Sequence, residues 1–160
     1  MVPDPGSPLS ADLAGILASV CRRWFAGGGA VRPLAQGGFS GAAVSLVEAG
    51  GERHVLKAFP AGTTRDRARW VHSHLQRARV AGVVEVPAIR LLADGESVVE
   101  AEGRLWEMTA FVDGVATDRA SADQVMAAAR VLGRLHQTAA RLGDRGESPA
   151  IAQRIEGAKR

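Results

Sequence analysis

Apolar residues recur along the chain with two different periods, one typical of helices and one typical of strands. A spacing of three to four residues over segments 10–25, 64–80 and 121–141 predicts three amphipathic helices. Hydroxyl side chains that can cap free backbone N–H groups stand at the starts of these segments: Ser10, Thr63 or Thr64, and Ser121. The pattern therefore predicts where each helix begins and which of its faces is buried.

Alternating runs rich in valine, leucine, isoleucine and alanine lie between the first and third predicted helices. They predict strands over residues 31–34, 42–48, 54–59, 88–93, 97–101 and 104–111. Gly50-Gly51 is a strong hairpin signal, and Asp94-Gly95 and Glu102-Gly103 mark two further turns. Because short loops join antiparallel strands, the expected fold class is α+β, with an antiparallel sheet and a helix packed on it.

The chain divides by pattern into a helical extension (1–30), a sheet-containing lobe (31–115) and the beginning of a helical lobe (116–160). Ser148-Pro149 is a typical helix start, and Ile151 and Ile155 begin a new apolar stripe. Little else in the sequence is available to cover this stripe. We therefore expect a larger second lobe to be missing; the alternative is that these helices complete a small fold.

The composition indicates a globular protein, with 46% hydrophobic residues, 23% charged residues and a mean hydropathy near zero. The net charge is only +3 and the arginines are scattered, which disfavours a nucleic-acid partner. Cys21, the single cysteine, excludes a disulfide framework and is expected to be a small buried side chain. No signal peptide or bilayer-spanning stretch is visible, so no membrane partner and a cytoplasmic location are expected.

A glycine-rich loop between the first two predicted strands is the first candidate for chemistry. It comprises Gly37, Gly38, Phe39, Ser40 and Gly41. Glycines there allow backbone N–H groups to approach phosphate oxygens without interference from a Cβ atom, and the serine would add a hydroxyl donor. The alternative is an ordinary glycine-rich hairpin turn.

Lys57 is the second candidate, because it interrupts an apolar strand. Alternation places Val55, Lys57 and Phe59 on one face, and Leu56 and Ala58 on the other. The ammonium group therefore needs a partner or a route to solvent. A phosphate is one such partner; a lysine that reaches water from a half-buried strand is the alternative.

Two further segments follow the lysine strand. Residues 105–114, LWEMTAFVDG, run from a strand into a turn, where exposed backbone groups can hydrogen-bond a planar base, although a plain strand end is the alternative. His136 lies on the apolar stripe of the 121–141 helix. We expect it to be a core histidine with one hydrogen bond rather than a catalytic base.

Taken in order, these features resemble the aminoglycoside phosphotransferase and choline kinase-like family, the phosphotransferase enzyme family. The shared features over residues 31–140 are the glycine loop, the VLK strand, a helix followed by VP, the DG turns, the F-x-x-G turn and the LGRLH helix. The resemblance implies a protein-kinase-like fold that uses ATP and Mg²⁺ to phosphorylate a hydroxyl of a small molecule. It also implies that residues 37–41 cover the phosphates, that Lys57 holds the α/β-phosphates, and that Ala110, Phe111 and Val112 receive adenine.

The sequence departs from the family pattern where the lysine needs a carboxylate. The 64–80 helix contains no glutamate, although kinase-like lobes usually place one there to pair with the strand lysine. Asp66 lies too near the first turn, and His72 or His74 would orient Lys57 less firmly than a carboxylate. The partner of Lys57 is therefore left open.

The second departure concerns catalysis. The family's H-x-D-x-x-x-x-N loop has no counterpart, because Leu142 and Pro149 stand at the histidine and asparagine positions around Asp144, and the chain contains no asparagine. We therefore assign no catalytic or metal-binding residue and expect a truncated phosphotransferase that is inactive as this chain alone. The alternatives are a non-catalytic nucleotide- or protein-binding module, with its C-terminal helices as the partner surface, and a small basic nucleic-acid binder.

Overall fold

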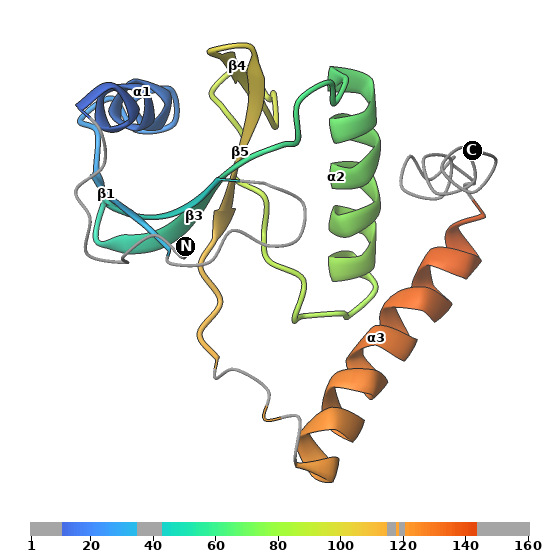
Figure 1. Cartoon of the computed structure of the whole chain (residues 1–160). Coiled ribbons are helices and arrows are strands. Elements are labelled where there is room, and N and C mark those ends of the chain that lie inside the picture. Colours follow the sequence, from blue (N-terminus) through green and yellow to red (C-terminus); the bar gives the residue numbers. More distant parts are fainter. Residues whose placement is uncertain (1–10, 35–42, 115–117, 119–120, 144–160) are drawn as a thin grey trace, which may run out of the picture. The chain divides into compact units, whose positions relative to one another are not determined.

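The structure, a computed structural model, describes residues 11–34, 43–114, 118 and 121–143. The chain forms two compact units, residues 1–116 and 117–160. Figure 1 shows the described helices and strands, coloured along the sequence. Among the described residues, no helix is long and apolar enough to cross a membrane.

An antiparallel sheet forms the centre of the first unit, and the described strands follow the order β1-β2-β3-β5-β4. The strands are β1 (Ala30–Pro33), β2 (Val44–Ala49), β3 (Glu52–Ala58), β4 (Val99–Ala101) and β5 (Arg104–Ala110). The order places β3 between β2 and β5, although β3 and β5 are far apart in the chain. The α+β prediction is confirmed.

The hairpin predicted at Gly50-Gly51 joins β2 to β3. Ala49 pairs with Glu52, so the two glycines alone form the loop. Their φ angles are +61° and +78°, which is the left-handed region that a two-residue hairpin turn requires and that glycine adopts without strain. This turn fixes the register of β2 on β3, and thereby the residue that lies opposite each position of β3.

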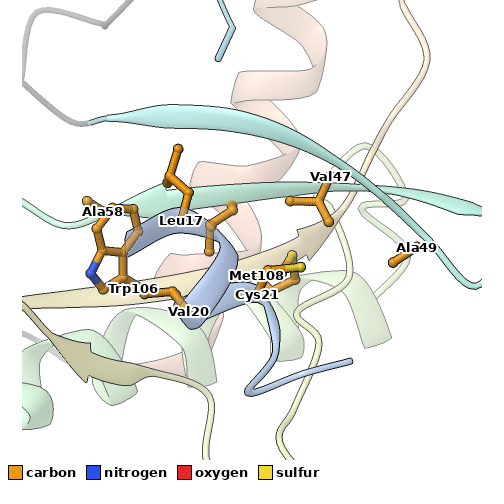
Figure 2. Packing of buried hydrophobic residues seen from close by; sticks show 9 residues of the cluster. Leu17, Val20, Cys21, Val47, Ala49, Ala58, Trp106 and Met108 are labelled. Atoms are coloured by element: carbon orange, nitrogen blue, oxygen red, sulfur yellow. The ribbon is translucent and has the colours of Figure 1, made fainter. Parts of the chain in front are cut away.

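Helix α1 (Ala11–Cys21) covers one face of the sheet (Figure 1). Its side chains meet those of β2, β3 and β5 in the main core cluster, shown in Figure 2: Leu17, Val20, Cys21, Val47, Ala49, Leu56, Ala58, Trp106 and Met108. Leu13 and Trp24 pack against the cluster, which confirms the predicted apolar stripe of this helix. Burial raises the pKa of the Cys21 thiol, in keeping with the expected role of a small core side chain.

Helix α2 (Arg65–Val80) packs on the other face, and Thr64 caps it by accepting a hydrogen bond from the Arg67 N–H at 3.2 Å. A second core cluster joins this helix to the sheet and consists of Phe59, Ala68, Val98 and Leu105. The strand alternation predicted around Lys57 is therefore confirmed: Leu56 and Ala58 face α1, whereas Phe59 faces α2.

One predicted strand and one predicted helix end in the first unit are wrong. Residues 88–93 form no strand, because their pairing with β5 is limited to a bridge between Ile89 and Thr109 and two flanking backbone hydrogen bonds. The first helix ends at Cys21 rather than at Phe25. In the turn that follows, Trp24 N–H and Phe25 N–H both donate to the Cys21 carbonyl, and the indole N–H of Trp24 donates to the Arg90 carbonyl at 2.9 Å.

The described part of the second unit is dominated by α3 (Ala122–Leu142), which begins at the predicted cap Ser121 and ends at Gly143 in the left-handed conformation. Its side chains Val125, Met126 and Leu132 are exposed. His136 is also exposed, so the expectation of a core histidine is wrong. The predicted helix from residue 148 lies outside the described residues.

Gly29 offers a direct test of the close packing between the residue before β1 and strand β2. A Cβ atom added there would lie 2.9 Å from the Glu48 carbonyl oxygen and 3.0 Å from the Ala49 Cβ. Because a backbone oxygen cannot move aside cheaply, we expect Gly29→Ala to lower the free energy of unfolding by about 1–3 kcal/mol. Urea denaturation measures this. Gly27→Ala is the matched control, since a Cβ at Gly27 meets no atom within 4 Å; equal stabilities for the two variants contradict the packing.

His54 makes the stability of the first unit depend on pH. The ring packs 5.0 Å from Phe25, and neither ring nitrogen has a hydrogen-bond partner in the described structure. Burial lowers the pKa of His54, Arg90 lowers it further, and Glu52 raises it in part. The unfolded chain therefore binds more protons just below about pH 6.5, and stability falls with decreasing pH by at most about 1.4 kcal/mol per pH unit.

We expect urea denaturation between pH 7.5 and pH 5 to show a shallower pH dependence in His54→Gln than in the wild type. His136→Gln, which replaces an exposed histidine by the same residue, glutamine, is the control for the substitution itself. The same slope in all three proteins would rule out a contribution from His54.

Candidate functional site

The candidate site begins with a pair of opposite charges on adjacent strands. Lys57 of β3 lies directly opposite Glu107 of β5 in the sheet register. The Lys57 Nζ atom donates a hydrogen bond to Glu107 Oε1 at 3.0 Å. The lysine side chain is 40% exposed and that of the glutamate only 9%, so the lysine is partly open to solvent while the glutamate is shielded.

His72 of α2 approaches the same carboxylate from the helix. Its Nε2 atom lies 2.5 Å from Glu107 Oε2, and the ring is buried. Since an ionised carboxylate only accepts hydrogen bonds, Nε2 carries a hydrogen atom and donates a hydrogen bond to Oε2. His72 Nδ1 is buried without a hydrogen-bond partner among the described residues. Both oxygens of Glu107 are therefore held, one by the lysine and one by the histidine.

The electrostatics of the three groups favour an ionised Glu107. Burial alone raises the pKa of this carboxyl group, but the hydrogen bond from His72 and the charge and hydrogen bond of Lys57 outweigh burial, so the pKa is lowered. Phe59 closes the cluster, with its ring 5.7 Å from that of His72 and 5.4 Å from the Lys57 Nζ. The result is a charged pair with one open side, at the ammonium group.

The residues that flank the glycine-rich segment lie next to Lys57 in the sheet. Leu34 N–H donates to the Val44 carbonyl at 3.0 Å, and Ala58 N–H donates to the Ala43 carbonyl at 2.9 Å. Val44 lies opposite Lys57 in the register of β2 and β3. The chain thus leaves and re-enters the sheet next to the lysine. Residues 37–41 themselves lie outside the described residues, so their contacts with phosphate stay a prediction.

The three residues expected to receive adenine lie at the end of β5 and just beyond it. Ala110 N–H donates to the Ala88 carbonyl at 2.8 Å, and Phe111 N–H donates to the Arg53 carbonyl at 3.0 Å. Both donors are therefore already used. Val112 is half exposed, and no group in the described structure accepts its N–H. If this segment binds a base edge, Val112 is its available donor.

An arginine fixes the segment that follows β5. The Arg53 guanidinium donates to both carboxylate oxygens of Asp113, at 2.7 and 2.6 Å, and lies 4.6 Å above the centre of the Phe111 ring. Both bonds come from the single Nη2 atom, and both side chains are exposed, so the contact lacks the two-nitrogen fork that restricts geometry most. Together with the bond from the Phe111 N–H to the Arg53 carbonyl, it connects residues 111–113 to β3, the strand that carries Lys57.

The structure brings Lys57 together with Glu107 and His72, and the sequence analysis left the lysine's partner open. The signal for Glu107 was present as an acid inside an otherwise apolar strand, since a buried acid requires a partner. A second signal is that only two of the 20 basic residues are lysines, Lys57 and Lys159. His72 was considered as the partner of Lys57, but it contacts Glu107 instead.

The site combines a partly exposed lysine side chain with the two ends of a glycine-rich loop, features that suit a nucleotide phosphate. The described residues hold no group of three or more His, Cys, Asp or Glu side chains able to bind a metal ion. Recognition of phosphate by Lys57 stays a prediction.

Comparison with known proteins shows that the chain belongs to the phosphotransferase enzyme family, whose profile matches residues 30–158. The resemblance predicted from the motifs is confirmed. A search of the curated proteins finds no match to this chain.

Two solved structures share the fold. An aminoglycoside phosphotransferase from Alicyclobacillus acidocaldarius superposes with a TM-score of 0.58 at 14% identity, covering 83% of this chain and 36% of that one. A spectinomycin phosphotransferase in complex with ADP and spectinomycin superposes with a TM-score of 0.60 at 12% identity, covering 92% of this chain and 42% of that one. The protein-kinase-like architecture is thereby established, and the chain spans less than half the length of either structure.

Proposed function

We propose that this chain is the nucleotide-binding portion of a phosphotransferase that uses ATP to phosphorylate a hydroxyl group of a small molecule. Membership of the phosphotransferase enzyme family supports the reaction class. The spectinomycin phosphotransferase with the same fold binds ADP together with its small-molecule substrate, which supports a nucleotide as the ligand. The observation that carries the proposal is the partly exposed Lys57 side chain, held by a buried carboxylate beside Val44, where the chain re-enters the sheet after the glycine-rich segment.

The proposed arrangement divides the nucleotide between two parts of the first unit. Lys57 and the backbone of residues 37–41 would bind the phosphates, and the segment of Ala110, Phe111 and Val112 would bind the base through the Val112 N–H. ATP binds with Mg²⁺ in this reaction class, and the metal neutralises phosphate charge during transfer. The acceptor hydroxyl is unspecified, because none of the described residues is assigned to it.

The proposal is tested by calorimetric titration of residues 1–160 with ATP, ADP and AMP in the presence of Mg²⁺. We expect ATP and ADP to bind and AMP to bind at least about tenfold more weakly, since AMP lacks the β-phosphate that the lysine would contact. Equal affinity for all three nucleotides, or binding of none, overturns the phosphate site.

Residues 1–160 alone are expected to bind nucleotide without transferring phosphate. The sequence has no H-x-D-x-x-x-x-N loop, so no carboxylate is assigned to orient the acceptor hydroxyl. Coupled detection of ADP release with aminoglycoside and amino-alcohol acceptors measures this. ATP-dependent phosphorylation above the rate without protein would contradict the prediction. The non-catalytic alternative makes the same binding prediction.

A further inference from the structure

We propose that Glu107 is a positioning residue that sets the Lys57 ammonium from the neighbouring strand, with His72 fixing its carboxylate from the helix. The inference rests on the proposed nucleotide site and goes further, because it replaces the helix carboxylate expected in kinase-like lobes with one from the sheet. Glu107 would act through Lys57, since its own side chain is almost fully buried.

The sheet itself sets the distance between the two charges. Lys57 and Glu107 occupy facing positions of β3 and β5, and their neighbours on both sides are paired in the same register. Side chains at facing positions of an antiparallel pair have Cβ atoms only about 5 Å apart. The ion pair therefore forms without any carboxylate from α2, because both charges belong to strands of the sheet.

His72 removes the remaining freedom of the carboxylate. A glutamate with one oxygen unbound can rotate away from its lysine, whereas Glu107 has its second oxygen bound by the buried His72 ring. Buried hydrogen bonds to a charged group contribute more than exposed ones because no water competes for them. The helix thus supports the lysine indirectly, through a histidine in a segment that contains no glutamate.

The hydrogen bond to Glu107 uses one N–H donor of the Lys57 ammonium group, and no other described residue accepts from it. An ammonium carries three N–H donors, and Glu107 accepts one of them. The 40% exposure of the Lys57 side chain leaves room for the others to meet phosphate oxygens. Loss of the Glu107 charge would leave the lysine free to turn toward water. We therefore expect weaker nucleotide binding without loss of the fold.

The chain permits a selective test, because it has only two lysines, Lys57 and Lys159. Reductive ¹³C-methylation gives each lysine an NMR signal, and Lys159→Arg identifies that of Lys57. The chemical shift of the Lys57 signal is measured at one pH without nucleotide, and ADP affinity is measured separately on unmodified protein. The proteins compared are the wild type, Glu107→Gln, and the control Glu100→Gln, at an exposed carboxylate that contacts Arg65 rather than Lys57.

In Glu107→Gln we expect the chemical shift of the Lys57 signal to move away from its wild-type value, because the carboxylate no longer holds the ammonium group, and ADP to bind about threefold to tenfold more weakly. Glu100→Gln is expected to match the wild type in both measurements. An unchanged Lys57 chemical shift in a folded Glu107→Gln protein overturns the inference. If Glu107→Gln does not fold, Glu107→Asp decides, because its shorter side chain is expected to shift the same signal.

The outcomes separate this inference from the proposed function. If wild-type protein does not bind ADP, the nucleotide site is wrong, yet the Lys57 chemical shift still shows whether Glu107 sets the ammonium group. If ADP binds equally to the wild type and to Glu107→Gln while the Lys57 chemical shift differs, Glu107 pairs with the lysine but does not position it for phosphate, and the inference is wrong.

Discussion

Replacement of Lys57 by methionine is expected to weaken ADP binding by about 10- to 100-fold, which corresponds to the loss of one or two hydrogen bonds from a charged donor to phosphate. Methionine keeps most of the length of the lysine side chain and its packing over Phe59 but removes the charge. The remaining Glu107 carboxylate would then face the phosphates without a cation between them, which adds repulsion to the lost attraction.

Lys159→Met is the matched control, because it removes the only other lysine and changes the net charge by the same amount. A general electrostatic effect on an anionic ligand would weaken binding equally in both variants, whereas a specific contact would affect Lys57→Met alone. Calorimetric titration with ADP at two salt concentrations distinguishes the two. Wild-type affinity in a folded Lys57→Met protein would remove Lys57 from the nucleotide site.

Features set by neighbouring residues could be predicted from the sequence. The caps Thr64 and Ser121 and the Gly50-Gly51 turn each depend on interactions within a few residues, and all three lie where the pattern places them. The alternation around Lys57 is equally local, because neighbouring strand residues point to opposite faces. Interactions between neighbouring residues therefore predicted the helices, the Gly50-Gly51 hairpin and the face of the sheet on which Lys57 lies.

Features set by distant residues could not be predicted in the same way. The partner of Lys57 depends on β5 pairing with β3, and no local signal fixes which strands become neighbours or in what register. Residues 88–93 show the converse, since they have the composition of a strand but form one isolated bridge. An acid at position 107, within an apolar strand, indicates that a cation lies nearby but does not identify the cation.

For the same reason, the structure tests the prediction for the adenine segment further than the prediction for the glycine loop. The ends of the loop lie beside Lys57, in agreement with a role in phosphate binding, but residues 37–41 lie outside the described structure. Two of the three N–H groups assigned to adenine are used by Ala88 and Arg53, contacts that only the tertiary structure reveals. Sequence order located the segment but could not show which of its donors is available.

The largest effect on stability is expected from Leu56→Ala, which should lower the free energy of unfolding by about 2–5 kcal/mol. Leu56 is fully buried on β3, in the cluster formed with Leu17 and Met108 among others. Truncation removes apolar contacts and leaves a cavity between the helix and the sheet, which the paired strands on both sides prevent from closing. The same substitution at the half-exposed Leu91 is the control and should cost far less.

Tryptophan fluorescence measures this effect in the first unit alone, because Trp24, Trp70 and Trp106 all precede residue 117. Trp106 belongs to the same cluster as Leu56, so its emission follows the loss of that packing. The position also separates stability from binding. Leu56 faces α1 whereas Lys57 faces the opposite side of the sheet, so a folded Leu56→Ala protein should bind ADP nearly as well as the wild type. Similar midpoints of urea denaturation for Leu56→Ala and Leu91→Ala would show that the cluster is not the core that stabilises the lobe.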